Sequence, residues 1–209
     1  QAEKSMESVH ALLNTPNGIE LMAPCYRQHA FKGANMLLFN PTTKENGGIF
    51  CQSQGWAILA EALLGHGNRA FEYFKESCPA AYNDRAEIRE VEPYVHSQFI
   101  EGHETPQSGR AHVHWLTGTA STVMVGMVEG ILGLRPTPDG LRISPSIPSS
   151  WDGFRMDKTF RGKRLHITVD NGAHHEGGAQ ALLVNGVRLD TDLLTDERLH
   201  DGDTITVVM

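Results

Sequence analysis

Cysteine is scarce in this sequence of 209 residues, and its three cysteines follow no ligand or disulfide pattern. Cys25, Cys51 and Cys78 are an odd number, and no two of them are spaced as Cys-x-x-Cys. This argues against a disulfide framework and against a cysteine metal site. We therefore expect three reduced thiols, which are typical of a cytoplasmic protein.

An excess of basic residues and long apolar runs are also missing. The sequence has 18 Lys and Arg against 25 Asp and Glu, a formal net charge of -7. Nucleic acids are bound by clustered Lys and Arg, so we expect no nucleic-acid partner. No run of about 18 apolar residues is present, so we expect no membrane span. No secretory leader is visible, although the first residue is Gln, which is compatible with a removed leader or with a longer protein.

What the sequence does have is a hydrophobic period that changes near Pro136. Before this residue, apolar residues recur every three to four positions, which predicts helices. The predicted helices are residues 2–13, 56–64, 69–77 and 119–132, and the loop-rich segments between them are 19–54 and 79–118. After Pro136 apolar and polar residues alternate, and Asn185-Gly186 is a strong hairpin signal. We predict a helical part over residues 1–135 and an antiparallel β-sandwich over residues 136–209.

The helical part is not self-sufficient, because four helices separated by long loops cannot easily bury their apolar faces. We therefore interpret it as the last part of a larger helical domain. In its last helix we expect Val123, Met124 and Ile131 to face inward. Gly130 should allow close helix packing, and Gly133 should end the helix.

The segment His112–Ala120 leads into that last helix. A helix N-terminus presents free N–H groups and roughly half a positive charge, which suits a phosphate or sulfate ion. The hydroxyl of Thr117 would add a polar group there. Every helix has an N-terminus, so this pattern predicts an anion site only together with its neighbours.

A second group of polar residues is suited to sugars. Lys44 and Glu45 precede two glycines, and an ammonium beside a carboxylate offers the donor and the acceptor that sugar hydroxyls need. Gln98 offers an amide with both functions. Each of these residues could equally lie on a solvated surface. Trp56 and Trp115 could stack on sugar rings or belong to the core.

Two further site types are weakly supported. His103, His112 and His114 suggest zinc, but the spacing that is diagnostic of zinc ligands is missing. A glycosidase pair of carboxylates cannot be chosen either, because several glutamates lie on charged loop segments. These glutamates are Glu87, Glu90, Glu92, Glu101 and Glu104.

Short segments along nearly the whole chain form an ordered set. They are Lys44–Phe50, Gln54–Trp56, Ala70–Phe74, Ala80–Arg89, Glu92–Val95, Trp115–Ala120, Ile131–Pro136, Asp139–Ile143 and Phe160–Gly162. This set resembles glycoside hydrolase family 94, the inverting disaccharide phosphorylases. The resemblance implies an α + β multidomain fold, in which residues 1–135 are the C-terminal part of an (α/α)6-barrel catalytic domain and residues 136–209 are an antiparallel β-sandwich domain.

The resemblance also implies a reaction. In such enzymes phosphate attacks the anomeric carbon of a β-glucosyl disaccharide directly, while an Asp protonates the leaving oxygen. That Asp is expected upstream of this chain, so no catalytic residue is assigned here. Inorganic phosphate is a co-substrate, and no cofactor or metal is implied. The implied partners are the rest of the catalytic domain and a second copy in a homodimer.

Residue by residue, the resemblance assigns Thr117 and Gly118 to phosphate. It assigns Glu45 and Gln98 to the glycosyl unit, with Lys44 adjoining them. Gln52 occupies a position where many members have a phosphate-binding His. Gln donates a hydrogen bond but adds no charge.

For the substrate, the segments 109–115 and 121–125 resemble those of members acting on cellobionic acid. The expected products are α-glucose 1-phosphate and the acceptor sugar. Cellobiose and laminaribiose are alternative substrates. A non-catalytic carbohydrate-binding or scaffolding fragment is the alternative from another class.

Overall fold

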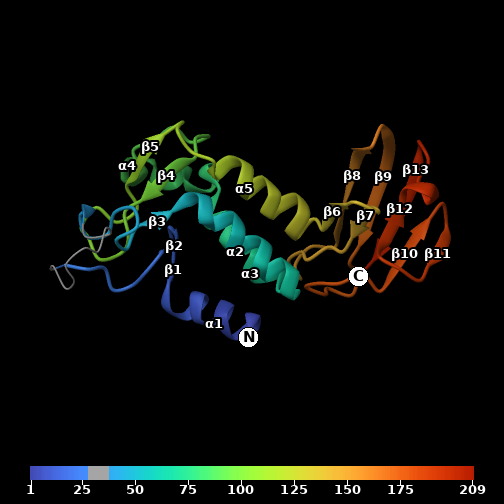
Figure 1. Ribbon diagram of the computed structural model, residues 1–209, viewed down its shortest axis with the longest axis horizontal. Coiled ribbons are helices and arrows are strands. Elements are labelled where there is room, and N and C mark those ends of the chain that lie inside the picture. The colour runs from blue at the N-terminus through green and yellow to red at the C-terminus, as the bar shows by residue number, and fades with distance from the viewer. Residues whose placement is uncertain (28–37) are drawn as a thin grey trace. The chain divides into compact units, whose positions relative to one another are not determined.

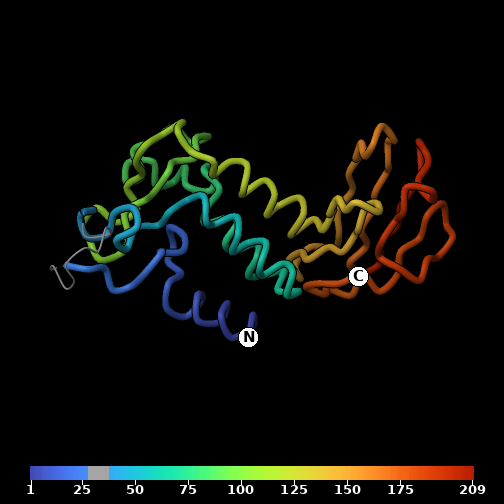
Figure 2. Tube along the Cα trace, viewed as in Figure 1, coloured from blue at the N-terminus to red at the C-terminus, as the bar shows by residue number. Residues whose placement is uncertain are grey.

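The computed structural model describes residues 1–27 and 38–209. Its contacts divide the chain into two compact units, whose elements are labelled in Figure 1 and whose path is drawn as a tube in Figure 2. The first unit is Gln1–Ala57 with Glu72–Met124, and the second is Ile58–Phe71 with Val125–Met209. These units are defined by contacts, whereas the predicted boundary at residue 135 concerns fold and stays a prediction.

Helices are the longest elements of the first unit. Those lying wholly or partly in it are α1 (Ala2–Leu12), α2 (Cys51–Leu64), α3 (Gly67–Ser77), the 3₁₀ helix η2 (Pro79–Arg85), α4 (Ala86–Arg89) and α5 (Thr119–Val125). The first three confirm the predicted helices, and α2 and α3 begin before the predicted residues. Trp56, in α2, is 64% exposed.

Short strands occupy the segments that the sequence predicts as loops. β1 (Asn14–Thr15) and β2 (Gly18–Ile19) form a hairpin. β3 (Ile49–Phe50), β4 (Ser97–Ile100) and β5 (Ala111–His114) form an antiparallel sheet in the order β3-β4-β5. Each strand has only two to four residues. That is too short for alternation to be seen in the sequence, which is why the loop prediction is wrong here.

The helix predicted over residues 119–132 changes type along its length. After α5 it continues as a π-helix, η3 (Gly126–Ile131), and Gly133 follows with a φ of 72°. Val123 and Ile131 are buried as expected, but Met124 is 63% exposed. Adjacent helical residues lie about 100° apart, so Val123 and Met124 do not share one face. A Cβ at Gly130 would lie 3.2 Å from the Cβ of Ala62, which confirms the close packing.

The second unit contains two sheets. A three-stranded sheet has the order β12-β7-β6, and a five-stranded sheet has the order β11-β10-β13-β9-β8. Their bounds are β6 (Leu134–Thr137), β7 (Gly140–Ile143), β8 (Gly153–Phe160), β9 (Lys163–Asp170), β10 (Ala181–Val184), β11 (Val187–Leu189), β12 (Leu193–Thr195) and β13 (Asp203–Val208). Asn185 and Gly186 form the predicted turn, with φ values of 50° and 81°.

One pairing corrects the prediction of a purely antiparallel domain. β13 runs parallel to β9, with Ile205 opposite Ile167 and Val207 opposite Val169. All four side chains are buried. Parallel strands need a long crossover connection, and alternation alone cannot reveal which strands it joins.

The architecture is therefore a mixture of helices with several mainly antiparallel sheets. The (α/α)6 barrel is a larger assembly than this chain, and it stays a prediction. Within residues 1–27 and 38–209, no helix is both long enough and apolar enough to cross a membrane.

Candidate functional site

Two residues predicted to bind phosphate lie against each other in the first unit. Gln52 is the second residue of α2, and Gly118 immediately precedes α5. A Cβ at Gly118 would lie 3.3 Å from Nε2 of Gln52. The glycine therefore leaves room for the amide, and the structure brings together positions that are far apart in the sequence.

The close approach of α2 and α5 produces this contact. A Cβ at Gly55 would lie only 2.3 Å from the carbonyl group of Thr122. The Thr122 hydroxyl donates to the carbonyl of Gln52 at 2.8 Å. Buried Gln54 holds α2 from the other side, because its amide donates to the Ile19 carbonyl and accepts from the Ile19 N–H, both at 2.9 Å.

Thr117, the third predicted phosphate residue, is bonded to the first residue of α5. Its Oγ1 accepts the N–H of Thr119 at 3.2 Å and lies 2.6 Å from the Thr119 hydroxyl. The Thr119 hydroxyl donates to the Ser97 carbonyl at 3.1 Å. Since Thr119 has one hydroxyl proton, Thr117 must donate its own proton to Thr119. Thr117 is half-buried and Gly118 is exposed.

Lys44 and Glu45 lie in a tight turn between Thr42 and Asn46. The Thr42 N–H donates to the Asn46 carbonyl at 2.8 Å, and Lys44 has a φ of 46°. The ammonium of Lys44 lies 5.4 Å from the ring centroid of Phe39, within cation–π range. Glu45 is exposed. The turn thus leaves the Glu45 side chain open to solvent, and a joint role of Lys44 and Glu45 in sugar binding stays a prediction.

Asn46 anchors this turn, and the sequence analysis missed it. It is 1% exposed. Its amide donates to the carbonyls of Tyr26 and Phe39 at 3.0 and 3.1 Å, and its Oδ1 accepts the Tyr26 N–H at 2.8 Å. The Lys-Glu-Asn-Gly-Gly motif contains the residue, but nothing in the sequence shows these long-range partners.

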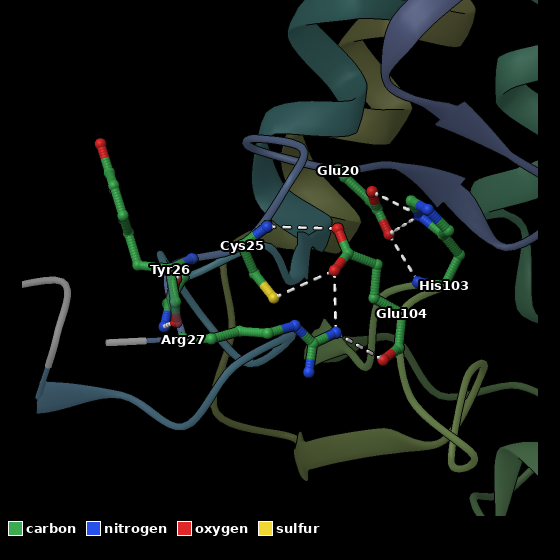
Figure 3. Close-up of polar contacts among 7 residues, drawn as sticks. Glu20, Cys25, Tyr26, Arg27, His103 and Glu104 are labelled. Atoms are coloured by element: carbon green, nitrogen blue, oxygen red, sulfur yellow. Dashed lines mark hydrogen bonds and ion pairs between the residues drawn. The ribbon is translucent and has the colours of Figure 1, made fainter. Parts of the chain in front are cut away.

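Hydrogen bonds of two acidic residues, Glu20 and Glu104, connect the segment 20–27 to the segment 103–104 (Figure 3). Buried Glu20 accepts from the backbone N–H of His103 at 2.6 Å and contacts its Nδ1 at 2.8 Å. Glu104 accepts from Arg27 at 2.8 Å and from the Cys25 N–H at 3.3 Å. Burial and the Glu104 carboxylate raise the pKa of the Cys25 thiol, so this thiol stays protonated and structural.

Gln98 lies on β4 between the two groups of predicted residues. Its neighbour Ser97 accepts from Thr119, and its neighbour Phe99 lies 5.9 Å from the Lys44 ammonium. Alternation along the strand places Gln98 on the opposite face from both neighbours. Within the described ranges, no hydrogen bond joins its side chain to Lys44 or Gln52. Gln98 therefore lies on the strand that contacts both the Lys44 turn and α5, but among the described residues its own side chain is bonded to neither.

His103 and His112 have structural partners, whereas Nδ1 of His114 is buried without a hydrogen-bond partner among the described residues. Nε2 of His112 lies 2.8 Å from Glu101, and its ring stacks on Phe99 with centroids 4.8 Å apart. His103 is held by Glu20. Among the residues that the structure describes, no three or more His, Cys, Asp or Glu are grouped to hold a metal.

The predicted site residues offer two kinds of hydrogen-bonding group. Gln52 and the α5 terminus offer neutral hydrogen-bond donors. The turn carrying Glu45, together with Gln98, offers donors and acceptors for hydroxyl groups. Trp56 and Trp115 are 64% and 67% exposed, which removes the alternative that they are core residues of this chain.

Comparison with known proteins identifies relatives. Residues 1–133 match the family model described as "Glycosyl hydrolase 94 superfamily, catalytic domain", and residues 134–175 match "Glycosyl hydrolase family 65, C-terminal domain". The chain is 38% identical over 209 residues to an N,N'-diacetylchitobiose phosphorylase of Vibrio furnissii, covering 100% of this chain and 26% of that protein.

Two further relatives are also phosphorylases. The N,N'-diacetylchitobiose phosphorylase of Vibrio proteolyticus is 33% identical over 208 residues, covering 100% of this chain and 26% of that protein. The cellobionic acid phosphorylase of Neurospora crassa is 27% identical over 176 residues, covering 82% of this chain and 22% of that protein. The chain spans about a quarter of the length of these relatives. Since the catalytic-domain model matches well over half of its residues, the chain belongs to the glycosyl hydrolase 94 superfamily.

Proposed function

We propose that the full-length protein is an inverting disaccharide phosphorylase. A phosphate oxygen forms a bond to the anomeric carbon of a β-linked disaccharide, and the glycosidic C–O bond breaks. The leaving oxygen takes a proton from a general acid, which is expected on a segment outside these 209 residues. The products are an α-sugar 1-phosphate and a free acceptor sugar. The observation that carries the proposal is the contact between Gln52 and Gly118 beside Thr117.

In this proposal the start of α5 holds the phosphate. The first N–H groups of a helix have no partner within it and favour an anion. Gln52 adds an amide donor through Nε2. Thr117 adds its hydroxyl when the proton turns from Thr119 to the phosphate. None of these groups is charged, so the cations that balance the phosphate come from elsewhere in the protein.

The sugar contacts come from the other predicted residues. Glu45 accepts hydrogen bonds from hydroxyl groups of the glycosyl unit, and Gln98 both donates and accepts. Lys44 lies next to Glu45 and over the rings of Phe39 and Phe99. These cation–π contacts fix the position of the ammonium.

For the substrate we favour N,N'-diacetylchitobiose over cellobionic acid. The identities of 38% and 33% to relatives named for the former exceed the 27% to the relative named for the latter. A buried aldonate also needs a cationic partner. Arg110, the arginine of the segment 109–115, is already paired with Glu90 at 2.8 Å. Cellobionic acid remains the second candidate because of the 27% relative.

The test is phosphorolysis by the full-length protein. Equal concentrations of N,N'-diacetylchitobiose, cellobionic acid, cellobiose and laminaribiose are incubated with phosphate, and the sugar 1-phosphate is measured. We expect the fastest release, as N-acetylglucosamine 1-phosphate, from the first. Faster release from cellobionic acid would reverse the choice of substrate. No release from any of the four would contradict the proposal and favour a carbohydrate-binding role.

The proposal extends to the oligomeric state and to the cofactor requirement. We infer a cytoplasmic homodimer that needs phosphate as co-substrate and neither cofactor nor metal. Sedimentation of the full-length protein tests the dimer. If no metal is needed, activity should be unchanged after dialysis against a chelator.

A further inference from the structure

A buried arginine on α4 has donor groups without hydrogen-bond partners. Arg89 is 5% exposed, and its Nη2 donates to the Val95 carbonyl at 3.3 Å. Its Nε and Nη1 are buried and have no hydrogen-bond partner within residues 1–27 and 38–209. A buried cation with unsatisfied donors is unfavourable unless an anion or a polar group compensates it.

A second guanidinium lies beside it. The guanidinium carbon of Arg89 lies 5.0 Å from the ring centroid of Tyr82, and that of Arg85 lies 4.7 Å from the same centroid. Such cation–π contacts stabilise each cation weakly and do not neutralise it. Two positive charges therefore lie close to the same ring, that of Tyr82.

None of the described groups that interact electrostatically with Arg89 is a carboxylate. They include Cys51, Cys78 and Tyr82, and Arg89 in turn helps to lower the pKa of His96. Burial raises the pKa of Cys51 to about 12 and that of Tyr82 above its usual range, so both are neutral at pH 7. No carboxylate of the described residues acts on Arg89, and the residues from 28 to 37 include no Asp or Glu.

A small cavity adjoins both guanidinium groups. Its polar lining residues are Arg85, Arg89 and Asn17, and the other lining residues are Tyr82, Ile88, Ile100 and Gly109. The space open to a water-sized sphere is about 10 Å³. That is about the minimum volume for one water, so any anion held here is monatomic, and phosphate, sulfate and a sugar are excluded.

We propose that this cavity binds one small monovalent anion of the halide class, with chloride as the natural occupant. Arg85 and Arg89 supply charge-assisted donors, and the Asn17 amide supplies a neutral one. The apolar wall keeps water away and strengthens the attraction. The bound ion ties α4 to the β1–β2 hairpin, which carries Asn17, and to β4. The inference uses none of the residues assigned to phosphate or sugar, so it stands apart from the proposed function.

The first test is thermal unfolding of the full-length protein. Chloride is titrated from 1 to 100 mM against gluconate at constant ionic strength. We expect Tm to rise by about 2 °C or more, because a ligand that binds only the folded state stabilises it. Arg89→Met should abolish the rise. Equal Tm in chloride and gluconate would overturn the proposal.

Two further variants keep the test decisive if Arg89→Met does not fold. Arg85→Gln, at the half-buried side of the cavity, should raise the chloride midpoint at least about tenfold, as for one lost charge-assisted bond. Arg155→Gln, an exposed arginine on β8, is the matched control and should respond like wild type. An unchanged midpoint in Arg85→Gln would contradict the site.

The occupant is identified directly by crystals grown in sodium bromide. We expect an anomalous bromide peak within hydrogen-bond distance of both guanidinium groups. A water in the cavity with no bromide peak would overturn the proposal.

Discussion

The hydroxyl proton of Thr117 is engaged before any phosphate arrives, because Thr119 accepts it at 2.6 Å. Thr119 cannot return the bond, since its own proton goes to the Ser97 carbonyl. On the proposed function, phosphate binding would therefore exchange a neutral hydrogen bond for a charge-assisted one, which is about twice as strong. The exchange favours the anion and restores the first bond when the anion leaves.

Thr117→Val should raise the KM for phosphate about tenfold to a hundredfold, as expected for a loss of about 1.5–3 kcal/mol. Thr117→Ser keeps the hydroxyl and is the matched control, with a change of about threefold at most. Initial rates of the full-length enzyme at varied phosphate and varied disaccharide separate the two KM values. An equal rise in the KM for disaccharide would show that Thr117 only supports the fold.

The carboxyl group of Glu76 is more stable in its neutral form in the folded protein. Its Oε1 accepts from Asn14 at 3.2 Å, whereas its Oε2 is buried without a partner among the described residues. Burial raises the pKa of Glu76 to about 7. Below pH 4.5 the carboxyl is protonated in both folded and unfolded states and costs nothing. Between pH 4.5 and 7 stability falls, because the unfolded state releases the proton first.

Glu76→Gln should therefore stabilise the protein at pH 8 by about 1–3 kcal/mol, allowing for partial solvent screening, and have little effect at pH 4.5. The glutamine can still accept from Asn14. Denaturant midpoints at the two pH values measure the difference, with Glu87→Gln, an exposed glutamate on α4, as the control. A gain of equal size at both pH values would exclude the proton as its cause.

At the scale of elements, β4 relates the two halves of the candidate site. Its Ser97 carbonyl is bonded to the first residue of α5, and its Phe99 lies beside the Lys44 turn and under His112. The strand pairs with β3 on one side and with β5 on the other. A shift of β4 by one residue would exchange its two faces and expose Phe99. The register of this short sheet is thus what places Gln98.

Gly55→Ala should push α2 and α5 apart, because the added Cβ would lie 2.3 Å from the Thr122 backbone. We expect a loss of about 1–3 kcal/mol in stability, the usual cost of overpacking, together with a raised KM for phosphate. Gly172→Ala is the control, since its nearest atom is a side-chain oxygen at 3.5 Å. Thermal unfolding and phosphate kinetics measure both effects. Wild-type behaviour of the Gly55 variant would refute the close helix contact.

Sequence patterns predict the helices and the β10–β11 hairpin, because helical period and turn residues are local properties. They do not predict β3, β4 and β5, whose pairing depends on residues far apart. Likewise, motifs assign Gln52, Thr117 and Gly118 individually. Their contact depends on how closely α2 approaches α5, and that distance is a property of packing. Buried Asn46 escapes sequence analysis for the same reason.

At the scale of the molecule, the chain spans about a quarter of the length of its curated relatives. If the general acid lies on another segment, residues 1–209 alone should release no sugar 1-phosphate from any β-linked disaccharide. Exposed apolar side chains such as Leu12, Trp56 and Leu63 should also make the isolated chain associate.

The measurement is a phosphorolysis assay with sedimentation, and the full-length protein is the control for both. Phosphorolysis by the isolated chain would locate the acid within these residues. A stable dilute monomer would show that its apolar faces need no partner.

The place of β13 has a consequence for synthesis on the ribosome. The hairpins β8–β9 and β10–β11 can each form as soon as their residues emerge, since both close through two-residue turns. They cannot join, because β13 lies between β9 and β10 and pairs with both. Until residues 203–208 leave the exit tunnel, each hairpin keeps an open edge that can pair with a neighbouring nascent chain. Crowded polysomes are therefore where this part of the protein is most exposed to misassembly.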